Sequence, residues 1–313
     1  MTDAQKFLAK IKSSENILII AHRLPDADTL GAAGALCFYI ARQLGQSVEF
    51  FCADAIPKSM EFLGLAEFIS RSGALNLANC DLIICVDSGD PSQTGIAEQL
   101  LARENIFLIN IDHHQTNTFY GDLNIVEMSS ATAEIVFKLL KSIGVKFTKE
   151  ISTCLLVGII SDTTYFTNAG TTKESMAIAS ELLKNQANIK QIIQSTWRKN
   201  SPESLRTWGK ILSQLHFNEK DKTVTAAIPR GDSVSPEVFE GLANFLTALY
   251  EADIIIVMRE TDDGFVKCSL RTTKDGIDVA KIAQARGGGG HAKAAGFSVK
   301  GHLEKTENGW EIK

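Results

Sequence analysis

Hydrophobic residues in the first 115 positions come in short runs, separated by stretches with helical spacing. Four runs predict strands, at residues 16–22, 47–54, 81–88 and 106–114. Their nearly continuous apolar character is typical of strands buried on both faces of a parallel sheet. Residues 29–44 predict a helix that Gly45 ends. We therefore expect an α/β fold with a doubly wound, mainly parallel sheet and helices on both faces.

The pattern changes after residue 129, where apolar positions take helical spacing. The last third predicts two hairpins, one turning near Glu219–Lys222 and one at the Asp-Asp-Gly of residues 262–264. Helices are expected at 235–249 and 277–285, which together indicate a smaller C-terminal α/β domain with a mixed sheet. The expected organisation is a first domain at 1–187, a helical linker at 188–210 and a second domain at 211–313.

Composition limits the functions that fit this chain of 313 residues. The net charge of −5 argues against binding long duplex nucleic acid, so a short anionic substrate would need local positive charge. No apolar stretch approaches the roughly 20 residues that span a bilayer, and the N-terminus lacks a signal-peptide core. Six scattered cysteines without a CxxC pair favour reduced thiols in a cytoplasmic protein.

Acidic and histidine residues cluster where four of the apolar runs end. The clusters contain His22, Asp26, Asp28, Asp87, Asp112, His113, His114 and Asp162. Ligands of open α/β sheets bind beyond the carboxyl ends of the strands, so these side chains are expected to converge. Taken alone, each cluster also fits an ordinary structural role, such as Asp28 or Thr29 capping the next helix. It is far less frequent for four such clusters to occur together by coincidence than for one to occur alone.

So many carboxylates in one cleft would repel one another, and divalent cations would relieve that repulsion. Imidazole with carboxylate ligands suits manganese, iron or zinc better than calcium. The number of ligands favours two ions roughly 3.5–4 Å apart, bridged by one carboxylate. Pro25 disfavours helix at Leu24, so an extended segment is expected to direct Asp26 and Asp28 to one side, with Thr29 capping the helix.

A second candidate site lies at "RGGGGHAKAAGF", residues 286–297. A glycine run that enters a helix would offer backbone N–H groups to phosphate or sugar oxygens. Arg286 and His291 flank the glycines, and Arg271 lies in a predicted strand upstream. A flexible loop with a buried histidine is the alternative interpretation of the same residues.

Together these motifs resemble the DHH phosphoesterase family, in the branch with a C-terminal domain that carries a GGGH motif. The family's motifs are met by His22, Pro25, Asp26 and Asp28, by Asp87, by Asp112, His113 and His114, by Asp162, by Ser269, Leu270 and Arg271, and by Gly288, Gly289, Gly290 and His291. The likeness extends over about residues 15 to 300. Within the branch, the chain resembles compact bacterial oligoribonuclease/pAp phosphatases, the nanoRNases.

The resemblance implies manganese-dependent hydrolysis of two- to five-residue RNAs to mononucleotides, and of pAp to AMP. It implies two divalent ions, most often Mn²⁺, with Mg²⁺ or Co²⁺ as alternatives. One ion would be held by His22, Asp26 and Asp87, and the other by Asp28, Asp87, His113 and Asp162. The catalytic set would comprise Asp87, Asp112, His113, His114 and Asp162, with His114 on the scissile phosphate. The substrate would also contact Arg271, Arg286, Gly288, Gly289, Gly290 and His291.

Other functions share parts of this pattern. A cyclic-dinucleotide or pApA phosphodiesterase would carry every motif named, whereas a pyrophosphatase would lack GGGH. A noncatalytic nucleotide- or RNA-binding protein of the same fold would be expected to have lost ligands, and all are intact here. The chain departs from many relatives at Gln93, where an arginine is frequent, and residues 163–170 lack the arginine or lysine that some relatives have after this aspartate, Asp162. A homodimer is compatible with the sequence.

Overall fold

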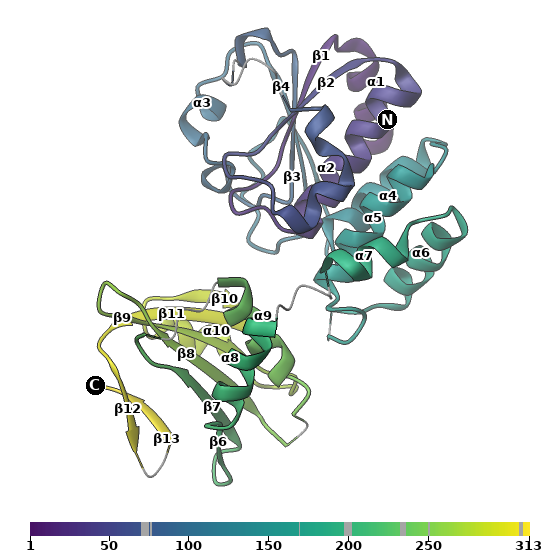
Figure 1. The fold of residues 1–313 in the computed structure, drawn as a ribbon. Coiled ribbons are helices and arrows are strands. Elements are labelled where there is room, and N and C mark those ends of the chain that lie inside the picture. The colour runs from purple at the N-terminus through teal and green to yellow at the C-terminus, as the bar shows by residue number, and fades with distance from the viewer. Residues whose placement is uncertain are drawn as a thin grey trace. The chain divides into compact units, whose positions relative to one another are not determined.

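The computed structural model describes residues 1–69, 75, 77–168, 170–196, 202–231, 236–249, 251–306 and 309–313. The chain divides into two compact units, Met1–Lys199 and Asn200–Lys313 (Figure 1). The predicted helical linker at 188–210 includes residues 197–201, which lie outside the described part. Helices α7 (Ile189–Thr196) and α8 (Pro202–Leu212) occupy its described remainder.

The first unit is built on a five-stranded parallel sheet in the order β2-β1-β3-β4-β5. Its strands are β1 (Asn16–Ile20), β2 (Ser47–Phe51), β3 (Leu82–Val86), β4 (Phe107–Asp112) and β5 (Leu123–Val126). The first four confirm the strands expected from continuous apolar runs. Strand β5 was not predicted, because only two of its four residues are buried and Asn124 interrupts its apolar character. The chain order reverses between β1 and β3, which is where ligands bind in such sheets.

Helices cover both faces of this sheet, because alternate residues of each buried strand point to opposite sides. Ile17, Ile19 and Ile84 share one core with α1 (Asp3–Ser13), α2 (Ala27–Phe38), α4 (Thr132–Ser142), α5 (Lys149–Asp162) and α6 (Lys173–Lys184). Leu18 and Ile83 share the opposite core with Leu100 of the short α3 (Ala97–Leu101) (Figure 1). The predicted doubly wound α/β architecture is confirmed.

Shorter helical turns complete the first unit. A π-helical turn (Tyr39–Leu44) continues α2, and Gly45 ends it with φ of 69°, as expected from the sequence. Four 3₁₀ turns occupy Lys58–Leu63, Leu65–Glu67, Leu77–Asn79 and Pro91–Thr94.

Glycines allow α2 and α5 to lie in direct contact. A Cβ atom on Gly31 of α2 would collide with the backbone carbonyl of Cys154 in α5. A Cβ atom on Gly158 of α5 would lie 2.6 Å from Oδ1 of Asp28, at the start of α2. This close approach brings the N-terminus of α2 near the C-terminus of α5, where Asp162 is the last helical residue.

The second unit contains a six-stranded mixed sheet in the order β10-β11-β9-β8-β7-β6. Its strands are β6 (His216–Asn218), β7 (Thr223–Ile228), β8 (Ile254–Glu260), β9 (Phe265–Arg271), β10 (Gly289–His291) and β11 (Ala294–Lys300). Only β7 and β8 are parallel among these pairs. Both predicted hairpins are present, and β12 (Leu303–Thr306) pairs with β13 (Gly309–Ile312) in a separate sheet.

Two helices cover opposite faces of the mixed sheet. Phe239 and Leu242 of α9 (Pro236–Leu246) share a core with Val257, and Val279 and Ala283 of α10 (Val279–Gln284) share the other. These helices match the predictions at 235–249 and 277–285, although residue 235 lies outside the described part. The predicted smaller domain with a mixed sheet is therefore confirmed.

The glycine run does not enter a helix, so that expectation was wrong. Helix α10 ends before it, and the run leads into β10, which pairs with β11. A Cβ on Gly290, whose φ is 138°, would lie 2.6 Å from the Cα of Ala295. A Cβ on Gly288 would meet the backbone of Gly296 and Phe297. These glycines therefore permit strand contact, which local sequence does not reveal.

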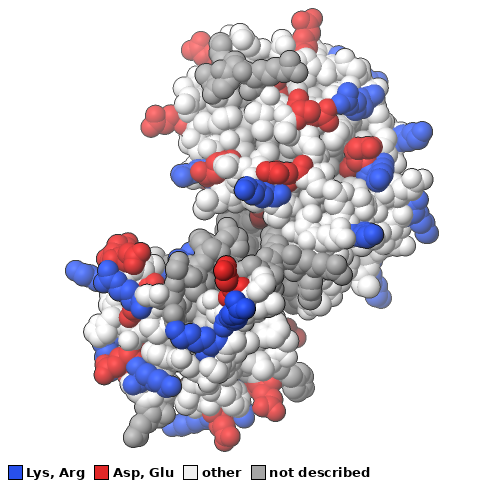
Figure 2. Space-filling model, in the orientation of Figure 1, with Lys and Arg blue, Asp and Glu red and all other residues white. Residues whose placement is uncertain are grey.

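Charged side chains are mixed in sign on the visible surface. On the face in Figure 2, lysines and arginines are interspersed with aspartates and glutamates over the described parts of both units. No helix among the described residues is long and apolar enough to cross a membrane.

Candidate metal centre

The predicted ligand side chains converge beyond the carboxyl ends of β1, β3 and β4. His22 and Asp26 follow β1, Asp87 follows β3, and His113 follows β4. Asp162 reaches the same place from the end of α5. The convergence follows from the parallel sheet, which directs these loops to one edge, and from the contact between α2 and α5.

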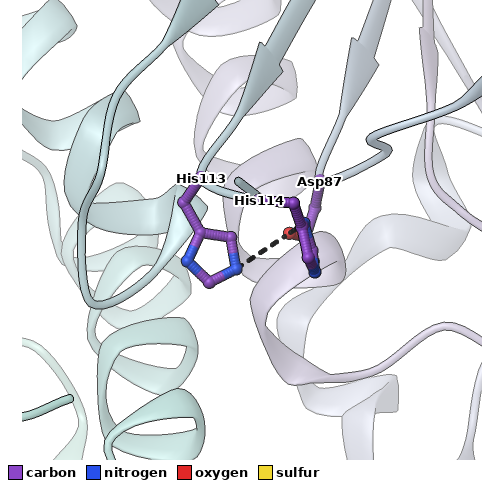
Figure 3. Close-up of side chains that lie close together, drawn as sticks. All are labelled: Asp87, His113 and His114. Atoms are coloured by element: carbon purple, nitrogen blue, oxygen red, sulfur yellow. Dashed lines mark ion pairs between the residues drawn. The ribbon is translucent and has the colours of Figure 1, made fainter. Parts of the chain in front are cut away.

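Asp87 lies at the middle of the cluster. Nε2 of His22 lies 3.4 Å from Oδ2 of Asp87 and 3.7 Å from Oδ1 of Asp26. Nε2 of His113 lies 3.6 Å from Oδ1 of Asp87 (Figure 3) and 3.5 Å from Oδ2 of Asp162. Oδ2 of Asp87 therefore faces His22 and Oδ1 faces His113, an arrangement that suits a ligand shared by two cations.

Among the described residues, three groups of side chains have potential ligand atoms within 4.8 Å of one another. The groups are His22, Asp26 and Asp87; Asp28, His113 and Asp162; and Asp87, His113 and His114. The first two correspond to the two ligand sets implied by the family resemblance, if Asp87 also joins the second. The residues present can thus surround two cations.

The hydrogen bonds of His22 and His113 direct their Nε2 atoms toward the carboxylates. Nδ1 of His22 lies 2.6 Å from the carbonyl oxygen of Arg23, and Nδ1 of His113 lies 3.1 Å from that of Ser129. A carbonyl oxygen only accepts, so Nδ1 carries the hydrogen in both rings and Nε2 offers its lone pair in the neutral form. Metal-ligating histidines are commonly held in this way.

His114 has a different environment, because its Nδ1 lies 2.7 Å from Oδ1 of Asp112. The other oxygen of Asp112 accepts a hydrogen bond of 2.6 Å from Nδ2 of Asn117. Burial raises the pKa of Asp112, but hydrogen bonds from His114 and Asn117 outweigh it and leave the pKa lowered. Asp112 is therefore an acceptor, and it holds the His114 ring with Nδ1 protonated. This state suits an imidazole that contacts an anion.

Asp26 caps α2, which corrects the expectation for this loop. Oδ1 of Asp26 accepts from the backbone N–H groups of Asp28 at 2.9 Å and Thr29 at 3.0 Å. The expected extended segment and the Thr29 cap were therefore wrong: Asp28 lies in the first helical turn. The reason is that Asp26 satisfies two otherwise unpaired N–H groups of the helix, and Leu24 turns the chain with φ of 51°.

Asp28 is fully buried against the start of α4. Its oxygens accept from the backbone N–H of Thr132 at 2.6 Å and of Ala133 at 2.9 Å. The Thr132 hydroxyl also donates to Oδ1 of Asp87 at 2.8 Å. The N-terminus of α4 thus orients two candidate ligands, a role that the sequence pattern around Thr132 did not indicate.

The electrostatics of the cluster fit divalent cations. Burial and neighbouring carboxylates raise the pKa of Asp28 and of Asp162 well above the usual range. Burial lowers the pKa of His22, but hydrogen bonds to Asp26 and Asp87 raise it to about 11. The cluster therefore retains protons to offset its negative charge, and cations with nitrogen and oxygen ligands could replace them.

Gln93 and the stretch after Asp162, where the sequence offers no cation, take part in local structure. Oε1 of Gln93 accepts from the backbone N–H of Gly89 at 2.7 Å and caps its own 3₁₀ turn. The Tyr165 hydroxyl, in the stretch after Asp162, donates to the Thr196 hydroxyl. Positive charge for a substrate would have to come from other residues.

In the second unit, the structure brings some of the predicted substrate-binding residues together. His291 pairs with Ala294, which pairs with Arg271, so both side chains point to the same face of the sheet. Nε of Arg271 donates to Asn244 of α9 at 2.9 Å, which places its guanidinium on the α9 face. The Arg286 guanidinium lies 5.3 Å from the Phe297 ring, on the opposite, α10 face. Gly288, Gly289 and Gly290 lead into and form the edge strand β10.

Comparison with known proteins identifies similarities over nearly the whole chain. Residues 16–159 match the model of the DHH family, N-terminal domain, and residues 220–309 match the DHHA1 domain. The bifunctional oligoribonuclease and PAP phosphatase NrnA of Thermus thermophilus is 33% identical over 290 residues, covering 91% of this chain and 84% of that protein.

Two further similarities are more distant. The cyclic-di-AMP phosphodiesterase GdpP of Bacillus subtilis is 28% identical over 95% of this chain, which spans only 48% of GdpP. Among solved structures, an exopolyphosphatase-related protein from Bacteroides fragilis superposes with a TM-score of 0.85 and 23% identity, covering 94% of this chain and 90% of that one. This structural likeness supports the fold.

Proposed function

Because this chain belongs to the DHH family of phosphoesterases, we propose that it is a manganese-dependent hydrolase of two- to five-residue RNAs and of pAp. The observation that carries the proposal is the placement of Asp87 between the Nε2 atoms of His22 and His113. The similarity to an oligoribonuclease and PAP phosphatase supports this substrate class. The expected products are mononucleotides from RNA and AMP from pAp.

In this proposal the first unit performs the chemistry. His22, Asp26 and Asp87 hold one cation, and Asp28, Asp87, His113 and Asp162 hold the other. When bound, the two cations would lower the pKa of water and offset charge on the phosphate. The backbone carbonyls beside His22 and His113 keep Nε2 of each ring directed inward. His114, held by Asp112, donates a hydrogen bond to a phosphate oxygen.

The second unit is proposed to bind the part of the substrate that does not react. Arg271 and His291 share one sheet face, separated by the small Ala294. Neighbouring strands lie about 4.8 Å apart, and β11 separates the strands of Arg271 and His291. The two residues are therefore about 10 Å apart, with the position over Ala294 between them. A nonreacting phosphate and its sugar could occupy that position. Arg286 would have to reach the substrate around the edge strand.

A substrate panel tests the proposed function directly. With Mn²⁺ present, turnover is measured on pAp, pApA, di- to pentaribonucleotides, cyclic di-AMP, pyrophosphate and long single-stranded DNA. Efficient cleavage of pAp and the short RNAs, with little of the long DNA, is expected. Cleavage of pyrophosphate alone would refute the proposal.

A cyclic-dinucleotide or pApA phosphodiesterase is the second candidate, and the similarity to GdpP favours it. The same panel separates the two, because this candidate requires cyclic di-AMP or pApA to be cleaved far faster than pAp. A noncatalytic nucleotide-binding protein would bind members of the panel without turning any over.

A further inference from the structure

A buried polar network lies behind the DHH motif. Asn110 and Asp112 are two residues apart on β4, and their side chains therefore point to the same side of the strand. Both are fully buried, and Asn117 in the following loop is 8% exposed. Buried polar side chains are costly unless each is hydrogen-bonded, so the partners of these three residues are informative.

Asn117 connects the other two members. Its Nδ2 donates to Oδ1 of Asn110 at 2.8 Å and to Oδ2 of Asp112 at 2.6 Å, which uses both hydrogens of the amide. Its Oδ1 accepts from the backbone N–H of Phe119 at 2.7 Å. The amide of Asn117 is thereby fixed in orientation, with a hydrogen directed at Asp112.

Asn110 anchors this arrangement to the neighbouring strand loop. Its Nδ2 donates to the carbonyl of Ser88 at 3.0 Å and to the hydroxyl of Tyr120 at 3.1 Å. Ser88 directly follows Asp87, so the network joins the loops that carry Asp87 and His114. The loop of Gly89 packs against this network, since a Cβ there would lie in ordinary van der Waals contact, 3.4 Å from Oδ2 of Asp112 and 3.6 Å from Cβ of His114.

The bond from Asn117 determines which oxygen of Asp112 remains for His114. With Oδ2 occupied, Oδ1 lies 2.7 Å from Nδ1 of His114. Without the Asn117 amide, Oδ2 would be buried with one donor fewer, and rotation of the carboxylate would let it compete for Nδ1 in another geometry. The ring of His114 would then lose its fixed direction.

We propose that Asn117 is a positioning residue that acts through Asp112 on His114, the group that contacts the substrate phosphate in the proposed function. The inference rests on that function for its kinetic consequence. Removal of an outer hydrogen-bond partner that orients an active-site group commonly costs about 10- to 100-fold in activity. The cost should appear in kcat, and the affinity for Mn²⁺ should stay within about threefold of wild type.

Asn124 provides a matched control in the same loop region. Its side chain accepts from the backbone N–H of Gly121 at 2.9 Å and donates to the carbonyls of Gly121 and Phe119. It therefore stabilises the same loop, and these hydrogen bonds go to Gly121 and Phe119 rather than to Asp112 or His114. Asn124→Ala is expected to lower the melting temperature but leave kcat within about twofold, whereas Asn117→Ala lowers kcat on a diribonucleotide by about 10- to 100-fold.

A double-mutant cycle with His114→Ala decides between positioning and a merely structural role. If Asn117 acts through His114, adding Asn117→Ala to His114→Ala should cause no further loss of kcat. Additive losses would overturn the proposal, as would equal losses of kcat in Asn117→Ala and Asn124→Ala. If Asn117→Ala does not fold, Asn117→Ser is used in the same cycle, because its hydroxyl keeps one donor and should give a smaller loss.

A readout independent of turnover separates this inference from the proposed function. In the Mg²⁺-loaded protein, the Nδ1–H resonance of His114 should be visible by ¹⁵N-resolved NMR and retained in Asn124→Ala. It should shift or exchange faster in Asn117→Ala. An unchanged resonance in Asn117→Ala overturns the positioning role, even if the substrate panel succeeds. A wild-type protein that cleaves none of the panel refutes the function and leaves this spectroscopic test in force.

Discussion

Replacing Gly158 with alanine is expected to destabilise the first unit, although alanine is the better helix former. Gly158 lies within α5, where the change from glycine alone would stabilise by about 1 kcal/mol. The added Cβ, however, would lie 2.6 Å from Oδ1 of Asp28 and 2.7 Å from Cβ of Ala133. Neither neighbour yields easily, because the Asp28 carboxylate is held by two backbone N–H groups of α4.

The size of the effect follows from these opposing contributions. Overpacking of a close contact costs about 1–3 kcal/mol, and two rigid contacts place this site at the upper end. After the gain in helix propensity, a net loss of about 2 kcal/mol remains. For a unit of this size, that corresponds to a melting temperature lower by about 4–8 °C. The displaced Asp28 should also weaken the more affected cation site by about tenfold.

Calorimetry and metal titration test this prediction, with Gly209→Ala as the control. Gly209 lies in α8 of the second unit, and a Cβ there would have no atom within 4 Å. The control should therefore stabilise its own unit by about 1 kcal/mol, the opposite sign for the same substitution. A Gly158→Ala protein that melts at or above the wild-type temperature, with unchanged Mn²⁺ affinity, would refute the close-packing argument.

Three further predictions concern charge and substrate binding. Because the pKa of His22 is raised to about 11 in the metal-free protein, Mn²⁺ must displace the proton of this histidine. The affinity for Mn²⁺ measured by calorimetry should therefore rise by up to about tenfold per pH unit, and a pH-independent affinity would contradict this prediction. Burial raises the pKa of Glu134, but hydrogen bonds from Ser130 and Lys138 leave this pKa lowered, so the ionised Glu134 should stop stabilising the fold as pH falls below about 4 in denaturant titrations. Lys138→Met should reduce this dependence of stability on pH, and an unaltered profile would contradict the ion pair. His291→Ala should raise KM for a diribonucleotide more than it lowers kcat, and the reverse pattern would remove His291 from the binding site.

Strong local patterns made much of the fold predictable. Strands β1 to β4 are nearly continuous apolar runs, so their type and order followed from residue character alone. The rule that loops of a parallel sheet meet at one edge then predicted that Asp87 and His113 would lie together. Strand β5 was not predicted, because Asn124 interrupts its apolar residues and the strand shows no clear pattern of hydrophobic and polar positions.

Features that depend on distant contacts were beyond the sequence. The conformation of Asp28 is determined by its bonds to Thr132 and Ala133, more than 100 positions away, which local propensity cannot anticipate. The helix expected after the glycine run was wrong, because the run leads into β10, which pairs closely with β11. The sequence assigned no role to Asn117, and its significance appears only once Asn110 and Asp112 are seen on the same side of β4.

In the proposed phosphoesterase, Asp87 joins the two cation sites, so its replacement tests the proposed function most directly. Asparagine is the sharpest replacement, because it matches the shape of aspartate and tolerates the left-handed backbone at this position, where φ is 57°. The decisive measurement is turnover of a diribonucleotide in Mn²⁺ by purified Asp87→Asn, with bound Mn²⁺ counted by equilibrium dialysis and folding checked by its melting curve. We expect a folded protein that loses nearly all turnover and binds fewer than the two ions expected for wild type. Wild-type turnover with two ions still bound would contradict it.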